Sequence, residues 1–250
     1  MGTRTKRYVE ATAFTHKGLL RENNEDSIAV AGWVADTEMT GARRSRHQLS
    51  EPLIFALADG MGGHAGGEIA SRYAIKRLAE PMSPCEQDLC DRLAAINAEL
   101  YQTMAAVPPL FGMGTTAVGL LLTASRAIWF NIGDSRLYRQ RGMRLEQLST
   151  DDIPPGPRSG IITQTLGGGA SFMPVAPHLG GEDLDVPSRW LLCSDGLTDM
   201  VEESELEQAM SLRDEEALGA MFTQAMAAGG ADNISIILVS VMADEAAPQP

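Results

Sequence analysis

Residues 52–59 read PLIFALAD, and residues 60–71 continue as GMGGHAGGEIAS. The first stretch is a nearly continuous apolar run of strand length, which predicts a strand buried on both faces. After the glycines, apolar residues recur at helical spacing from Glu68 to Leu78, which predicts an amphipathic helix. Asp59 therefore ends a buried strand and stands directly before a glycine-rich turn into a helix.

The same patterns, followed outward along the chain, predict many strands and one helical hairpin. Strands are predicted over residues 8–15, 27–33, 115–123, 127–132, 135–140, 144–147, 161–165, 189–194 and 233–241. Helices are predicted over 86–104 and, as one or two helices, between 202 and 228. Residues 35–50 are expected to form a surface loop or a long hairpin connection, and 151–160 an irregular segment. Runs of strands interrupted by one helical hairpin favour an α+β fold in which helices cover a β-sandwich.

The length and composition fit one globular domain. The chain has 250 residues, of which 44% are hydrophobic and 21% charged, so we expect one domain over residues 1–250 with frayed tails at 1–7 and 244–250. No apolar run approaches the roughly 20 residues that a spanning helix needs, and no apolar segment follows the basic N-terminus. The three cysteines show no metal-ligand spacing and fit a reducing compartment. These features predict a cytoplasmic protein without a membrane partner.

The net charge of −13 restricts the possible partners. A surface this acidic repels a phosphate backbone, which argues against a nucleic-acid partner. A phosphoryl group can still bind to an acidic protein when metal ions supply the local positive charge.

Four aspartates lie at the ends of predicted strands: Asp59, Asp134, Asp195 and Asp232. Strand ends hold side chains rigidly while opening to solvent, and carboxylates are the hard ligands that Mg²⁺ and Mn²⁺ prefer. Carboxylates brought together repel one another and partly protonate unless a cation lies among them. Taken singly, each aspartate is explained first as an ordinary turn residue, and Asp59 and Asp195 stand in Asp-Gly, a strong turn dipeptide. The pattern therefore suggests a divalent-metal site without establishing one.

The stretches around these aspartates carry a family resemblance. They read RENNEDS (21–27), ADGMGGHAGGEIAS (58–71), GMGTTAVG (112–119), NIGDSRLY (131–138), LLCSDGLTDMV (191–201) and ADNISIILV (231–239). Together and in this order they resemble the metal-dependent protein phosphatases of the protein phosphatase 2C type, the PPM family, in its bacterial serine/threonine-specific form. The resemblance covers about residues 14–241. It implies a central β-sandwich of two mainly antiparallel sheets flanked by helices, in four layers (αββα).

The resemblance also implies a metal centre of two Mn²⁺ or Mg²⁺ ions. Asp59 would bridge both ions, and the carbonyl group of Gly60 would hold one of them. Asp195 and Asp232 would hold the second ion. Asp134 matches the position that, with Asp195, can hold a third, weaker ion. An enzyme of this kind hydrolyses phosphoserine and phosphothreonine in proteins by attack of a metal-activated water.

Four further residues receive roles from the resemblance. Glu25 would contact the metal site through water, and Asp26 would be a supporting acid beside it. Arg21 matches the arginine that grips the substrate phosphate, a role that suits its planar fork of donors. His64 is a candidate for the acid that protonates the leaving alkoxide; a structural role at the entry to the helix is the alternative.

The chain departs from bacterial family members between residues 150 and 160. This segment is short and rich in proline, where relatives carry a longer flap beside the metal site. We expect a reduced, stiff flap, weaker binding of a third metal ion, and a more open substrate groove. Asp151 and Asp152 lie nearby, but neither aligns securely with the aspartate that relatives use.

Three functional hypotheses follow. The first is an active phosphoprotein phosphatase that reverses a bacterial serine/threonine kinase, so that its partners are phosphorylated proteins, including a kinase or its targets. The second is a pseudophosphatase that binds phosphoproteins without turnover, which the presence of Arg21, Asp59, Asp195 and Asp232 disfavours. The third is a hydrolase of small phosphate esters, for which the sequence specifies no small-molecule pocket.

Overall fold

Alternation along the long central strands produces two layers of core. In β14 (Ile234–Ala243), Ile237 and Val239 pack between the two sheets, whereas Ile236 and Leu238 pack on the opposite side, against helices. A strand that is apolar on both faces needs a layer on each side, which explains its continuous apolar sequence. The computed structural model describes residues 7–62, 66–156 and 160–243.

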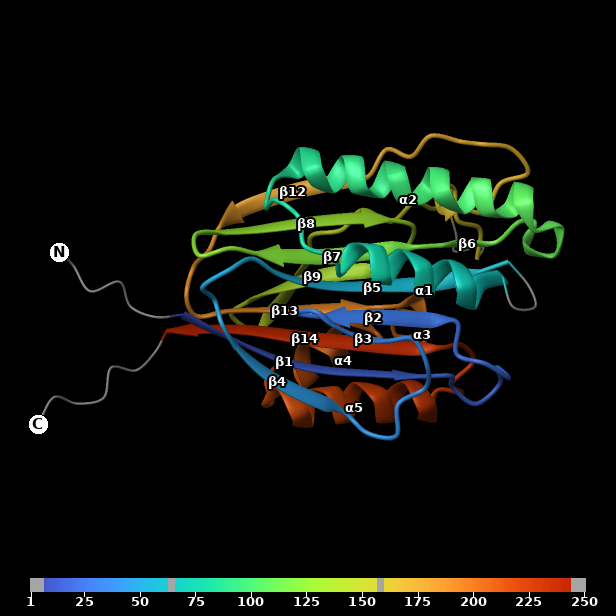
Figure 1. Ribbon diagram of the computed structural model, residues 1–250. Coiled ribbons are helices and arrows are strands. Elements are labelled where there is room, and N and C mark those ends of the chain that lie inside the picture. The colour runs from blue at the N-terminus through green and yellow to red at the C-terminus, as the bar shows by residue number, and fades with distance from the viewer. Residues whose placement is uncertain (1–6, 63–65, 157–159, 244–250) are drawn as a thin grey trace, which may run out of the picture.

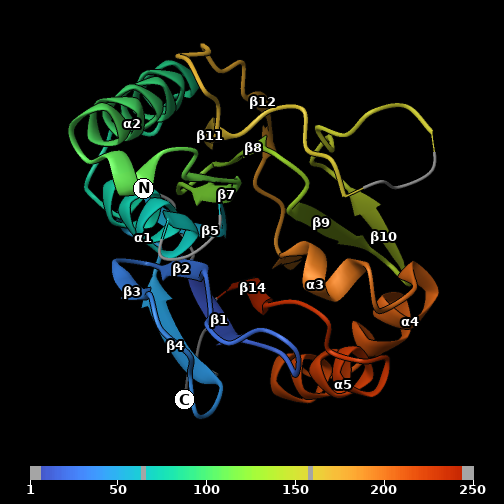
Figure 2. The same ribbon diagram turned by 90° about the vertical axis from the view of Figure 1, so that its right-hand side faces the viewer.

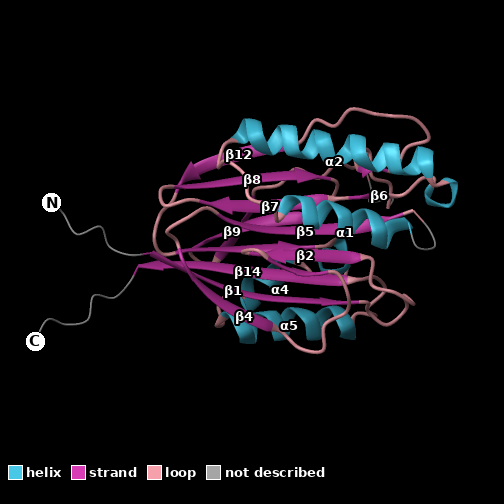
Figure 3. Cartoon of the chain, viewed as in Figure 1, coloured by secondary structure: helices cyan, strands magenta, loops and turns pink. Residues whose placement is uncertain are grey.

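Two antiparallel sheets lie face to face (Figures 1 and 3). The first has six strands in the order β10-β9-β13-β14-β1-β4, and the second has eight, with the path β11-β6-β5-β7-β8-β12 and with β2 and β3 beside β5. The strands of the first are β1 (Arg7–His16), β4 (Arg43–Gln48), β9 (Arg136–Arg141), β10 (Arg144–Gln147), β13 (Ser188–Cys193) and β14. Those of the second are β2 (Asp26–Val30), β3 (Trp33–Ala35), β5 (Leu53–Met61), β6 (Gly114–Thr115), β7 (Ala117–Leu122), β8 (Arg126–Ile132), β11 (Leu166–Gly167) and β12 (His178–Asp183).

Helices cover the outer face of each sheet. The second sheet packs against α1 (Gly66–Leu78) and α2 (Glu86–Ala106), and the first against α3 (Asp195–Thr198), α4 (Glu203–Ala209) and α5 (Asp214–Ala227). A short 3₁₀ turn at Pro108–Leu110 follows α2, since the two prolines cannot continue the helix. Figure 2 shows the resulting helix–sheet–sheet–helix order from one end. The predicted four-layer αββα sandwich is confirmed.

Most predicted elements have the expected type, but the prediction for the polar stretch 35–50 was wrong. It contains β4, which pairs antiparallel with β1 at the edge of the first sheet. Its sequence, RRSRHQ, is basic and half exposed, so it lacks the apolar alternation of a central strand. Charged side chains are common on edge strands, where they discourage pairing with other molecules.

Other boundaries differ for identifiable reasons. The predicted strand 27–33 is split into β2 and β3 by a tight turn at Ala31 and Gly32, both with positive φ. Residues 161–165 form no strand, and β11 begins only at Leu166. The strand β12 was missed because its sequence, HLGGED, has two glycines; it forms because β8 offers an open edge.

The predicted frayed tails overlap the described residues at one position only. Residues 1–6 and 244–250 lie outside the described residues. Arg7, counted with the frayed N-terminus, instead begins β1, and its guanidinium donates to the carbonyl oxygen of Ala124 at 2.7 Å. That part of the prediction was wrong, because pairing of β1 with β14 extends to Arg7.

Candidate metal centre

Two aspartates face each other at the end of the second sheet. In the antiparallel pairing of β2 with β5, Asp26 lies directly opposite Asp59, so the two side chains share one face of the sheet. Asp26 is 1% exposed, and its Oδ2 accepts hydrogen bonds from Ser194 Oγ (2.9 Å) and Ser235 Oγ (2.6 Å). Both serines belong to the first sheet's side of the sandwich. Asp26 therefore links the two sheets beside Asp195, the residue after Ser194.

Five aspartates converge here strongly enough to affect one another's protonation. Burial, followed by repulsion from Asp26, Asp195, Asp232 and Asp134, raises the pKa of Asp59 well above its ordinary value. Burial raises the pKa of Asp26 to about 7. The hydrogen bonds from its two serines lower this pKa, and repulsion from Asp195 and Asp232 raises it further. Residues separated by up to about 200 positions in sequence thus form one acidic cluster, which is the arrangement that cations stabilise.

The chemistry of the cluster fits hard divalent cations, although its side chains do not form a closed coordination shell. Among the described residues, no three acidic, histidine or cysteine side chains surround a common point at ligand distance. Asp232 also faces Arg21, whose Nη2 donates to its Oδ2 at 2.5 Å. The donors are all oxygens, and a positive charge among them would relieve the repulsion that raises the pKa of Asp59.

Glycines allow the backbone segments of the site to touch. A Cβ atom on Gly60 would lie 2.3 Å from the carbonyl oxygen of Gly67 and 2.6 Å from that of Glu25. One on Gly67 would lie 2.2 Å from Oε2 of Glu25, and one on Gly196 would lie 2.0 Å from the carbonyl oxygen of Asn233. Any larger residue at these positions would push the carboxylate-bearing segments apart.

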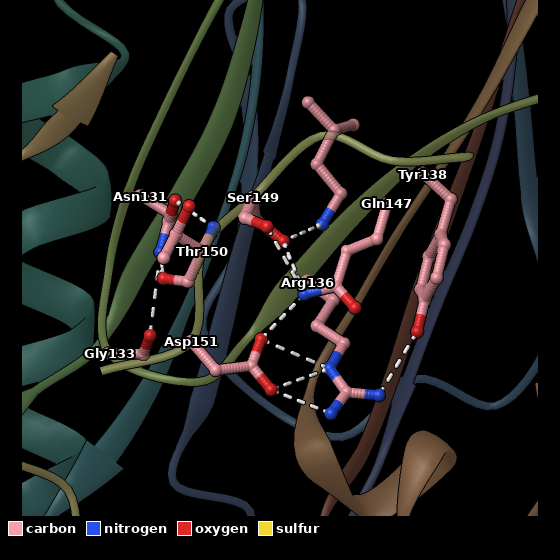
Figure 4. Close-up of polar contacts among 9 residues, drawn as sticks. Asn131, Gly133, Arg136, Tyr138, Gln147, Ser149, Thr150 and Asp151 are labelled. Atoms are coloured by element: carbon pink, nitrogen blue, oxygen red, sulfur yellow. Dashed lines mark hydrogen bonds and ion pairs between the residues drawn. The ribbon is translucent and has the colours of Figure 1, made fainter. Parts of the chain in front are cut away.

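Asp134 lies in the turn between β8 and β9, and this turn is pinned to the segment that follows β10. Asn131 exchanges two hydrogen bonds with the backbone of Thr150. Arg136 donates to both carboxylate oxygens of Asp151, with a shortest distance of 2.6 Å (Figure 4). The hydroxyl of Tyr138 accepts from the third nitrogen of Arg136 at 3.1 Å. The carboxylate of Asp151 therefore forms an ion pair with Arg136.

Both carboxylate oxygens of Asp152 also have partners within the protein. Its Oδ2 accepts from the backbone N–H of Gly133 (2.8 Å) and from Gln164 Nε2 (2.9 Å), and its Oδ1 lies 2.9 Å from Nε2 of His178. His178, which supplies this contact, is the first residue of β12. The two acids thus fix the base of the short flap.

Comparison with known proteins gives the family. A sequence model of protein phosphatase 2C matches residues 42–242. The chain belongs to the protein phosphatase 2C family. It is 32% identical to the serine/threonine protein phosphatase PstP of Mycobacterium tuberculosis over 252 aligned residues, which cover 92% of this chain and 44% of that protein. It is 29% identical to the serine/threonine phosphatase stp of Listeria monocytogenes, over 90% of this chain and 93% of that protein.

Solved structures agree with this assignment. The catalytic domain of PstP in complex with two manganese ions superposes with a TM-score of 0.77 at 32% identity, covering 94% of this chain and 99% of that one. The predicted family and fold are therefore confirmed. The chain spans less than half the length of full PstP, so it corresponds to the catalytic part of that relative. Among the described residues, no helix is long and apolar enough to cross a lipid bilayer.

The structure brings most predicted site residues of this phosphatase-family chain together. The residues brought together are Arg21, Glu25, Asp26, Asp59, Gly60, Asp134, Asp195 and Asp232. Their roles as ligands or phosphate contacts stay predictions. His64 lies outside the described residues. Sequence reasoning missed Asn233 and Arg136, although both stand inside the quoted motifs, next to Asp232 and two residues after Asp134.

The raised pKa of Asp26 predicts how the metal-free protein responds to pH. The folded state holds a proton that the unfolded state releases, so stability should fall as pH rises from about 4 to about 7. The Asp26→Asn variant should show a smaller fall, by on the order of a few kcal/mol. Part of the fall should remain, because the pKa of Asp59 is raised too.

Urea unfolding in the presence of a chelator at pH 5 and pH 8 measures this difference. Asp183→Asn serves as the matched control, since the Asp183 side chain is 92% exposed. Equal losses of stability in wild type and Asp26→Asn would contradict the prediction.

Proposed function

We propose that this chain is a metal-dependent protein serine/threonine phosphatase. The observation that supports this most is the convergence of five aspartates from both sheets beside one arginine, Arg21. An acidic cluster alone repels a phosphate monoester, whereas a cluster that holds cations attracts it. The serine/threonine phosphatase names of PstP and stp support the substrate class.

The residues receive the following roles in this proposal. Asp59, Asp195, Asp232 and the carbonyl group of Gly60 would hold two Mn²⁺ or Mg²⁺ ions, and Glu25 would reach the site through water. When bound, such ions lower the pKa of a water nucleophile and hold phosphate oxygens for in-line displacement. The two manganese ions in the structure of the PstP domain support this number.

Arg21 would bind the substrate phosphate. Its side chain is 55% exposed and borders a small pocket of about 190 Å³ that Glu22, Asn23, Glu25 and Asn233 also line. The guanidinium group needs only to turn from Asp232 to offer two parallel donors to a phosphate group. The leaving alkoxide requires a proton, for which His64 is the candidate; the alternative remains a structural role for this histidine.

The cellular setting belongs to the same proposal. We infer that the chain is one catalytic domain, acts in the cytoplasm, and reverses a serine/threonine kinase by acting on its targets or on the kinase itself. Co-purification would test the kinase partner. The Asp195→Asn variant, which should bind substrate without hydrolysing it, should retain a phosphorylated kinase that wild type does not retain.

Release of phosphate from a phosphothreonine peptide, with and without Mn²⁺, tests the activity. Wild type should release phosphate only with metal, and Asp195→Asn should lose the activity while keeping its fold. Asp183→Asn provides the matched control and should behave as wild type. Wild-type binding of the peptide without turnover would instead favour a pseudophosphatase. Turnover of p-nitrophenyl phosphate without any phosphopeptide activity would favour a hydrolase of small esters.

A third metal ion should bind more weakly than the first two. Arg136 holds the carboxylate of Asp151, and Gly133, Gln164 and His178 hold that of Asp152. Neither carboxylate can serve as an additional metal ligand without breaking those contacts. Calorimetric titration with Mn²⁺ should show two tight sites and a third at least about 10-fold weaker, which Asp134→Asn removes. A third site as tight as the first two would contradict this.

A further inference from the structure

The loop that joins β1 to β2 contains Arg21 and Glu25, and the side chain of Asn233, from a distant part of the chain, hydrogen-bonds to both ends of it. We infer that Asn233 is a positioning residue, which seats residues 17–25 so that Arg21 and Glu25 face the acidic cluster. This inference rests on the proposed phosphatase function. It assigns to Asn233 a role in binding the substrate phosphate, through Arg21, rather than a role in contacting the phosphate itself.

The hydrogen bonds of Asn233 reach both ends of the loop. Its Nδ2 group donates to the carbonyl oxygens of Lys17 (3.0 Å) and Asn23 (2.9 Å), and its Oδ1 accepts from the backbone N–H of Glu25 (2.8 Å). Asn233 is 4% exposed, so these bonds are shielded from competing water. Arg21 lies between the bonded positions, so this amide group fixes the backbone on both sides of it.

Backbone contacts fix the loop to the same segment. The N–H of Leu19 donates to the carbonyl oxygen of Gly230 at 2.7 Å. Gly18 has a φ of +77°, and a Cβ atom there would lie 2.2 Å from the carbonyl oxygen of Asp232. The loop thus packs directly on the residues around Asp232, the predicted metal ligand that also pairs with Arg21.

The chemistry of the contact requires an asparagine. The side-chain amide supplies two donors and an acceptor at once, and these match two carbonyl groups and one N–H group. Aspartate has the same shape but would place a carboxylate against two carbonyl oxygens. Alanine would leave all three backbone groups of the loop without their partner. Either change should loosen the loop while leaving the strand β14 paired on both edges.

Kinetics on a phosphothreonine peptide with Mn²⁺ provide the test. Asn233→Ala should raise the KM about 10-fold or more, with a smaller effect on kcat. In an Arg21→Ala background, the same change should alter the KM by less than about 2-fold, because Asn233 acts through Arg21. Asn97→Ala is the matched control: Asn97 lies on α2, is also buried, and bridges Gly167 and Met173 rather than the loop. Its KM should equal that of wild type.

Hydrogen–deuterium exchange provides a readout that does not depend on activity. Exchange over residues 17–25 should increase in Asn233→Ala and not in Asn97→Ala. Should Asn233→Ala fail to fold, Asn233→Ser takes its place in both measurements. Equal exchange and an unchanged KM, or effects of Asn233→Ala and Arg21→Ala that simply add, would overturn the inference. A wild-type protein with no phosphopeptide activity would refute the proposed function instead, while exchange would still decide whether Asn233 holds the loop.

Discussion

Asp59→Asn will reduce metal-dependent phosphopeptide hydrolysis by about 100-fold or more, because loss of residues that merely support a metal ligand already costs about 10–100-fold. The same substitution will stabilise the metal-free protein at pH 8. Asp59 is surrounded by four other aspartates, and burial together with their repulsion raises its pKa well above the ordinary value. Asparagine has nearly the same shape and no charge, so it removes this repulsion.

The sign of the stability effect follows from the protonation states. A carboxyl group whose pKa is raised in the folded state destabilises the fold as pH rises above its unfolded value. At pH 4 the two proteins should therefore be similar in stability, and at pH 8 the variant should unfold at a higher temperature than wild type in chelator. Added Mn²⁺ should reverse the order, since a ligand that binds the folded state stabilises wild type and stabilises the variant less.

Thermal unfolding at both pH values, with chelator and with Mn²⁺, checks this prediction beside the activity assay. Asp183→Asn, which changes an exposed aspartate at the end of β12, should match wild type in all conditions. A lower unfolding temperature for metal-free Asp59→Asn at pH 8 would mean that Asp59 stabilises the fold by itself. Retained activity would remove Asp59 from the predicted ligand set.

Arg139→Ala will destabilise the fold by about 3–5 kcal/mol, the range found when one partner of a buried ion pair is removed. The Arg139 side chain is 5% exposed and forms an ion pair with Glu182 of β12, while its Nη2 donates to Ser188 Oγ at 3.1 Å. Its guanidinium also lies 5.5 Å from the ring centre of buried Trp190. These contacts tie the edge strand β12 of one sheet to β9 and β13 of the other.

Urea unfolding measures this loss. The slope of the unfolding free energy against urea concentration should be the same in Arg139→Ala and wild type. Arg144→Ala is the control: Arg144 is 84% exposed and 3.4 Å from Glu207, so its loss should cost less than about 1 kcal/mol. Glu182 keeps its ion pair with Arg141 at 2.7 Å, which places the expected value toward the lower end of the range. A loss below about 1 kcal/mol for Arg139→Ala would show that the pair of buried Arg139 with partly exposed Glu182 contributes no more than a surface pair.

The sequence by itself determined the elements whose side chains follow a clear period. The apolar run before Asp59 became β5, and the spacing of apolar residues over 86–104 became α2. Burial along one helix face or on both strand faces depends on neighbours within a few residues, so local pattern suffices to predict it. The aspartates at strand ends were visible for the same reason, and the family motifs around them identified the family.

Only the tertiary structure decided which of these residues meet. The strand register places Asp26 opposite Asp59. The packing of the sheets places the Asn233 side chain within hydrogen-bonding distance of the backbone of Lys17, Asn23 and Glu25. The strand β12 forms although its own sequence disfavours it, because β8 offers an unpaired edge. Hydrogen-bond partners more than 200 residues apart depend on register and packing of whole sheets, and no local period in the sequence records them. That is why the sequence could name the acids of the site but not the asparagine that aligns its arginine.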